Sequence, residues 1–91
     1  MSTVHVHVIV RGKVQGVGFR FFVQETAEAL AVSGTVRNCA DGTVKAELEG
    51  PDQAVQAVID RLKQGPRMAR VDGVETIPGE ATGVTGFHVI G

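Results

Sequence analysis

The segment with the clearest chemical potential runs from Gly12 to Arg20 and reads GKVQGVGFR. A glycine-rich turn that leads into a helix leaves backbone N–H groups without helical partners, and these groups can converge on an anion such as phosphate. Gly16 and Gly18 permit the positive φ angles that such a cradle needs. Arg20, in the first helical turn, can offer two parallel N–H donors to phosphate oxygens. The residues alone leave a second interpretation open, a tight strand-to-helix connection followed by a surface arginine.

A second polar residue, Asn38, lies shortly before the turn dipeptide Asp41-Gly42. An Asn in this place commonly hydrogen-bonds its own backbone as a turn former, and the residues alone favour that role. Its amide can also donate and accept hydrogen bonds without titrating, which suits the orientation of a water molecule. Its neighbour Cys39 should face the other side of the strand and has no histidine at a recognisable spacing, so we expect a thiol without a catalytic role.

Three histidines raise the question of a metal site. His5 and His7 share one face of the first predicted strand, and His88 falls in the last one. If the last strand lies beside the first, three imidazoles could bind zinc or copper. The favoured interpretation is a solvated polar stripe, and therefore no metal. A charged face on a later strand is interpreted in the same way; it comprises Lys45, Glu47 and Glu49.

Length and composition bound the remaining function classes. The 91 residues predict a single domain over residues 1–91, and the formal net charge of −1 does not favour nucleic acid or an anionic membrane as a partner. No apolar run approaches the roughly 18 residues that span a bilayer. The glycine spacing of residues 12–18 matches neither common nucleotide-binding pattern, and no cofactor is predicted. We therefore expect a cytoplasmic protein without nucleic acid or membrane as a partner.

The elements that must position these residues follow from the hydrophobic pattern. Alternating valines from Val4 to Arg11 predict a strand, and apolar residues at helical spacing predict a first helix that ends near Ser33-Gly34. Gly50-Pro51-Asp52 opens a second helix, and Gly65-Pro66 ends it. The other predicted strands are Thr35–Cys39, Val44–Glu49, Val71–Ile77, which Pro78 terminates, and Phe87–Ile90, with a polar loop over Glu80–Gly86.

The resulting order of elements is βαββαβ, and an alternative order adds one further strand near the end of the chain. Right-handed crossovers then give an α+β, ferredoxin-like sandwich, in which two helices cover one face of an antiparallel sheet. Because many unrelated functions share this fold, the fold alone does not define an activity.

The glycine-rich segment resembles the signature of the acylphosphatase family, G-x-V-Q-G-V-G-F-R, at every specified position. A second family block resembles Gly34-Thr35-Val36-Arg37-Asn38. The resemblance extends over nearly the whole chain through the following further positions: Asp41-Gly42, Val44, Gly50, Gly65-Pro66, Phe87 and Val89.

This resemblance implies specific roles. The chain would act as a monomer on a small-molecule substrate. It would hydrolyse acyl phosphates without a metal, with Arg20 binding the phosphoryl group and Asn38 positioning the attacking water. Backbone N–H groups of the loop would hold the phosphate; they belong to Gln15, Gly16, Val17, Gly18, Phe19 and Arg20. Thr35 departs from the family, which commonly has Trp there. We expect Thr35 to face away from Asn38, so that the substitution affects packing more than chemistry.

Other functions remain as alternatives. The nearest is a non-catalytic anion-binding domain, or a fragment of a hydrogenase-maturation carbamoyltransferase, since acylphosphatase-like domains also occur in those larger proteins. A ferredoxin-like RNA-binding domain would need aromatic residues on the central strands, and a metal-carrying one would normally show paired cysteines in the first loop; the chain has neither.

Overall fold

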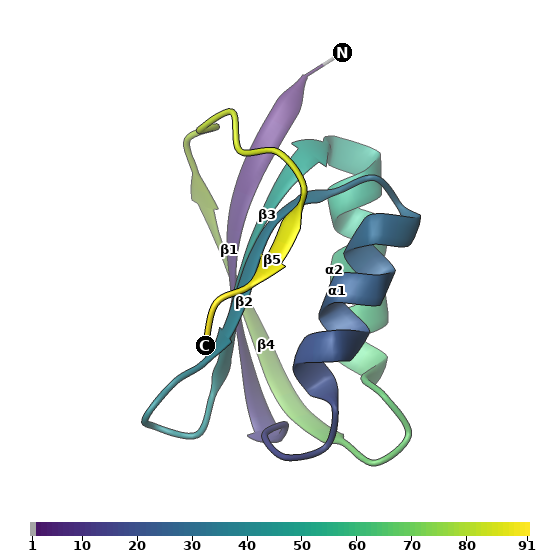
Figure 1. Cartoon of the computed structure of the whole chain (residues 1–91), viewed down its shortest axis with the longest axis vertical. Helices are drawn as coiled ribbons and strands as arrows, with labels where there is room; N and C mark the ends of the chain where they lie inside the picture. Colours follow the sequence, from purple (N-terminus) through teal and green to yellow (C-terminus); the bar gives the residue numbers. More distant parts are fainter. Residues whose placement is uncertain (1) are drawn as a thin grey trace.

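The computed structural model describes residues 2–91 of the chain. The two helices lie side by side on one face of a five-stranded sheet (Figure 1). We call the opposite face of the sheet the outer face. The elements are β1 (Thr3–Lys13), α1 (Phe19–Ala29), β2 (Ser33–Asn38), β3 (Val44–Pro51), α2 (Asp52–Gln64), β4 (Arg70–Gly79) and β5 (Phe87–Val89). This arrangement confirms the predicted ferredoxin-like α+β fold.

The strand order is β4-β1-β3-β2-β5. The first four strands pair antiparallel, and β5 adds a short parallel strand beside β2, with Gly34 opposite Phe87. The expectation that the last strand could lie beside the first was therefore wrong. Both sides of β1 are already occupied, by β3 and by β4, so β5 cannot pair with β1 and instead pairs at the β2 edge.

Period-two alternation in β1 decides which side chains reach the core. Val8 and Val10 are fully buried against the helices, while His5 and His7 project from the outer face. Each helix contributes one apolar stripe to the same core, because residues three and four apart share a helix face. The buried stripes are Phe19, Val23, Thr26 and Ala27 in α1, and Val55, Val58, Ile59 and Leu62 in α2.

Two predicted boundaries were wrong. Helix α1 ends at Ala29 rather than near Ser33, because Ala31 adopts a positive φ of 56° and β2 already begins at Ser33. Strand β4 continues through Pro78 to Gly79, opposite Val6 and His5. Proline is tolerated there because β4 is an edge strand, where one side of the strand needs no N–H donor. No helix in residues 2–91 has both the length and the apolar character needed to cross a membrane.

Residues 80–86 connect β4 to β5, which lie at opposite edges of the sheet, so this segment crosses the sheet near one end (Figure 1). Glu49 of β3 anchors the crossing. Its carboxylate accepts hydrogen bonds from the backbone N–H groups of Thr82 and Gly83, both at 2.7 Å, and from the Thr82 hydroxyl at 3.2 Å. Glu49 is only 4% exposed, so the prediction of a solvated face was wrong for this residue. Periodicity predicts which face a residue occupies, but not what covers that face.

These contacts make stability pH-dependent. The Thr82 backbone N–H, followed by the His5 ring, lowers the pKa of Glu49 from 4.5 to about 2. A depressed folded-state pKa stabilises the protein above the unfolded pKa, and this contribution is lost as the pH falls from about 4.5 towards about 2. We expect Glu49→Gln to be less stable than the parent at pH 7, with the difference shrinking across that window. Urea denaturation in the presence of a chelator, followed by far-UV circular dichroism, measures this difference in unfolding free energy at each pH. A difference that stays constant from pH 7 to pH 2 would contradict this role of Glu49.

Candidate active site

The segment between β1 and α1 lies at the lower end of the molecule in Figure 1. Gly16 and Gly18 have positive φ angles of 73° and 77°, and Gly18 is the N-cap of α1. The first helical hydrogen bond runs from the Phe22 N–H to the Gly18 carbonyl, at 3.1 Å. Within residues 2–91, the N–H groups from Gly16 to Phe21 have no hydrogen-bond acceptor, and the first turn carries no acidic residue. The helix N-terminus therefore presents free donors and positive potential.

A pocket of about 130 Å³ lies beside these donors. It brings together Arg20, from the first turn of α1, and Asn38, the last residue of β2, although 18 positions separate them in the sequence. Of the other residues predicted for the site, Gly16, Gly18 and Phe19 line the pocket, whereas Gln15 and Val17 do not. Val14 and Phe21 complete its wall.

Asn38 does not form the turn that follows it. Asp41 does so instead, because its carboxylate accepts hydrogen bonds from the Thr43 hydroxyl at 2.7 Å and the Thr43 N–H at 3.0 Å. These two bonds lower the pKa of Asp41. The Asn38 Oδ1 atom is buried and lacks a hydrogen-bond partner among the described residues. A buried, unpaired amide oxygen is costly, and such groups are concentrated at functional sites.

Gln15 has a role that the sequence analysis missed. Its side-chain Nε2 donates to the carbonyls of Cys39, at 2.7 Å, and Thr43, at 2.9 Å. The amide therefore ties the glycine-rich loop to the β2–β3 turn and fixes the distance between the free N–H groups and Asn38. The available signal was a single amide side chain in a loop otherwise made of valine and glycine.

The backbone carbonyl of Gly91 further aligns the two central residues. It accepts a hydrogen bond from the Arg20 guanidinium at 2.6 Å and another from the Asn38 backbone N–H at 3.1 Å. The guanidinium is thus held near the end of β2, while its remaining N–H donors stay available. Because a guanidinium has five donors, one such contact does not prevent bidentate binding of an anion.

The other candidates lie elsewhere. Cys39 does not line the pocket, and its carbonyl serves Gln15. Thr35 lines a hollow on the outer face with His5 and Glu47, which confirms that it faces away from Asn38. His88 lies on β5, where its ring contacts the Thr85 carbonyl at 3.0 Å. The three-histidine cluster was therefore wrong, because β2 and β3 separate β5 from β1.

The fold and this pocket define a ferredoxin-like α+β domain with exposed N–H donors, an arginine and an amide at one end of the sheet. Comparisons with known proteins point to one family. The acylphosphatase family model matches residues 6–89. The chain is 49% identical over 81 residues to an acylphosphatase from Thermus thermophilus, covering 89% of this chain and 92% of that protein. The chain belongs to the acylphosphatase family, whose members are hydrolases that act on acid anhydrides.

Solved structures are also similar. The crystal structure of an acylphosphatase from Bacillus subtilis superposes with a TM-score of 0.93 at 34% identity, covering 96% of this chain and 98% of that one. Full-length HypF in its phosphate- and nucleotide-bound form gives a TM-score of 0.88 at 26% identity. This match covers 99% of the present chain but only 12% of HypF.

Proposed function

We propose that the chain hydrolyses acyl phosphates to a carboxylate and inorganic phosphate, with Arg20 and Asn38 as its catalytic residues. One observation carries the assignment of these residues. Free N–H donors, the Arg20 side chain and Asn38, whose buried amide oxygen has no partner among the described residues, all line one small pocket.

The phosphoryl group of the substrate would bind against the loop N–H groups from Gly16 to Arg20, while the acyl group extends towards solvent. The guanidinium of Arg20 neutralises phosphoryl oxygens, on which charge is spread in a loose, metaphosphate-like transition state. Donors that already point at this position stabilise the charge without reorganising during the reaction. Val17 contributes its backbone N–H, and Gln15 contributes through the conformation of the loop; the side chain of neither lines the pocket.

Asn38 would orient the attacking water. Its Oδ1 atom accepts a hydrogen bond from the water, so the lone pair of the water oxygen points at phosphorus. The residues that line the pocket include no His, Asp, Glu, Lys or Cys. Therefore the substrate phosphate itself accepts the proton of the water in this mechanism.

The substrate class explains why so few groups suffice. The leaving group is a carboxylate, whose conjugate acid has a pKa of about 4, so it departs without a general acid. Among the described residues, those that line the pocket also include no His, Cys, Asp or Glu, the side chains that usually bind zinc. We therefore expect hydrolysis to be independent of metal ions.

The experiment that tests this function measures benzoyl phosphate hydrolysis in the presence of a chelator, with the parent chain and Asn38→Ala. We expect chelator-resistant turnover by the parent and a kcat about 100-fold lower in Asn38→Ala, because water orientation is lost. KM and inhibition by inorganic phosphate should change little, since the phosphate contacts remain. Gln56→Ala, which removes an exposed amide on α2, is the matched control and should retain full activity.

Two results would contradict the proposal. If the folded parent chain shows no turnover but still binds inorganic phosphate, the alternative of a non-catalytic anion-binding domain is favoured. If Asn38→Ala retains its kcat, Asn38 does not orient the water.

A further inference from the structure

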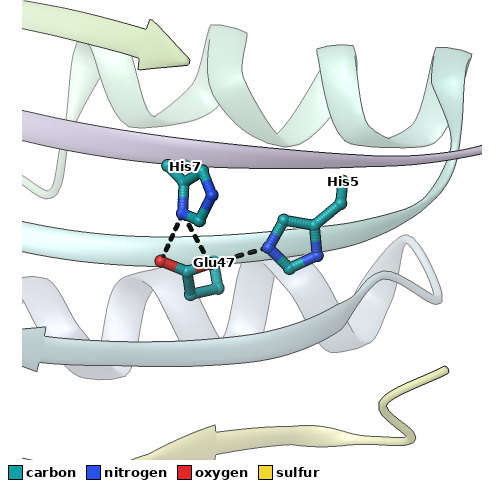
Figure 2. Close-up of side chains that lie close together, drawn as sticks. All are labelled: His5, His7 and Glu47. Atoms are coloured by element: carbon teal, nitrogen blue, oxygen red, sulfur yellow. Dashed lines mark hydrogen bonds and ion pairs between the residues drawn. The ribbon is translucent and has the colours of Figure 1, made fainter. Parts of the chain in front are cut away.

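A second group of chemically active side chains lies on the outer face, on the middle part of β1 and β3. His5 and His7 of β1 both point at Glu47 of β3 (Figure 2). The Glu47 carboxylate lies 2.6 Å from the His5 Nε2 atom and 2.7 Å from the His7 Nδ1 atom. One ring nitrogen from each histidine and one Glu47 oxygen all lie within 4.8 Å of one another. We propose that these three side chains bind a divalent ion of the zinc class.

The register of the sheet produces this cluster. His5 pairs with Glu49, and His7 pairs with Glu47, so two histidines and two carboxylates occupy adjacent rows of the outer face. Gly79 of β4 lies opposite His5 on the other side. A Cβ atom on Gly79 would lie 2.7 Å from the His7 Nε2 atom and 3.0 Å from the His5 Cδ2 atom. The missing side chain thus leaves room for both rings.

His5 is held in the orientation that a metal ligand requires. Its Nδ1 atom contacts the Glu49 carboxylate at 2.7 Å, and Glu49 is in turn held by Thr82 and Gly83. The Nε2 atom therefore points towards Glu47. A histidine whose second nitrogen is bound to a fixed carboxylate is the usual supporting arrangement of protein zinc sites.

The cluster is accessible as well as ordered. The His5 side chain is 6% exposed, whereas those of His7 and Glu47 are 44% and 39% exposed. His7 and Glu47 line a hollow of about 280 Å³ through which an ion and its water ligands can enter. Lys45 and Arg37 line the same hollow and will weaken cation binding, whereas the nearby Glu49 carboxylate strengthens it.

The donor set decides the class of ion. Two imidazoles and one carboxylate suit zinc and the neighbouring transition metals, whereas calcium and magnesium prefer oxygen ligands alone. In a tetrahedral zinc site the donor atoms lie roughly 3.3 Å apart, from zinc–nitrogen distances of about 2.0 Å. The ring nitrogens of His5 and His7, which lie within 4.8 Å of each other, therefore have to approach to this spacing, and Glu47 has to move outward, as the ion replaces the protons that join the carboxylate to the two rings.

Isothermal titration calorimetry of the full chain with zinc chloride tests the proposal, and histidine ring ¹⁵N resonances identify the ligands. We expect one ion per chain and selective shifts of the His5 and His7 rings. His7→Ala and Glu47→Gln should each weaken binding at least about tenfold. His7 is half-exposed, so its replacement should leave the fold intact, which circular dichroism verifies.

His88→Ala and Cys39→Ser are the matched controls, because each removes a potential zinc ligand outside the cluster. Both should bind zinc as the parent chain does. A parent chain that binds no zinc at millimolar concentration would overturn the proposal. Equal weakening by His88→Ala and His7→Ala would overturn it as well, since the ion would then bind histidines in general.

Discussion

Replacing Arg20 with lysine is expected to lower kcat/KM for benzoyl phosphate by about 100-fold, and replacing it with methionine by about 1000-fold or more. Lysine keeps the charge but not the planar fork that places two donors on neighbouring phosphate oxygens. Binding of inorganic phosphate should weaken in parallel, in contrast to Asn38→Ala, in which only kcat falls. Steady-state kinetics with phosphate as a competitive inhibitor measures both effects.

Arg37→Lys provides the matched control for this prediction. Arg37 precedes Asn38 in β2 but lines the hollow beside His7 and Glu47 on the outer face. The same change at Arg37 should therefore leave kcat/KM for benzoyl phosphate unaltered. Arg20 also contacts the Gly91 carbonyl, and a thermal denaturation curve distinguishes lost chemistry from a loosened C-terminal segment. If Arg20→Lys keeps kcat/KM within about threefold of the parent, the bidentate role of Arg20 is incorrect.

Gly34→Ala is expected to destabilise the fold by about 4 kcal/mol or more, which is a large part of the stability of a small domain. Gly34 has a φ of 147°, and a Cβ atom there would lie 1.7 Å from the carbonyl oxygen of Glu47. That oxygen belongs to the backbone of β3, which pairs with β2 at this point, so it cannot move without breaking the ladder. Urea denaturation followed by circular dichroism gives the change in unfolding free energy.

Gly73→Ala is the corresponding control. Gly73 lies in the edge strand β4, and no atom lies within 4 Å of the position its Cβ would take. The same chemical change should therefore alter the unfolding free energy by less than about 1 kcal/mol. Comparable destabilisation by both substitutions would contradict the collision at Gly34 as the cause of the cost.

The sequence predicted most of this fold because its signals are local. Alternating valines determine the buried face of β1, and Pro51 and Gly65 bound α2 closely. The partner of β5 was missed because strand pairing depends on which edges are already taken, and this is a property of the whole sheet. The extension of β4 through Pro78 was missed for the same reason, since only the strand order shows that β4 is an edge.

The site was predictable to a similar degree. The glycine-rich loop and Arg20 follow from the chain itself, whereas the preference for Asn38 as a catalytic residue came from a resemblance. On local grounds Asn38 was favoured as a turn former, and the structure gives that role to Asp41. The tether from Gln15 to Cys39 and Thr43 spans 24 and 28 positions, and no local pattern encodes such contacts. The burial of Glu49 was missed because the backbone N–H groups that donate to its carboxylate lie 33 and 34 positions away in the sequence.

The strand order also governs how the chain folds. β1 pairs with β3 and with β4, so Thr3 must pair with Pro51 and His5 with Gly79, which lie far along the sequence. The hairpin of β2 and β3, closed by the tight turn at Asp41-Gly42, needs only a short loop to close. We therefore expect this hairpin to form early and β1 to be incorporated late, as in other domains dominated by distant pairings. During synthesis, the valine-rich first strand remains unpaired until most of the chain has emerged, and in this interval it is most exposed to association with other chains.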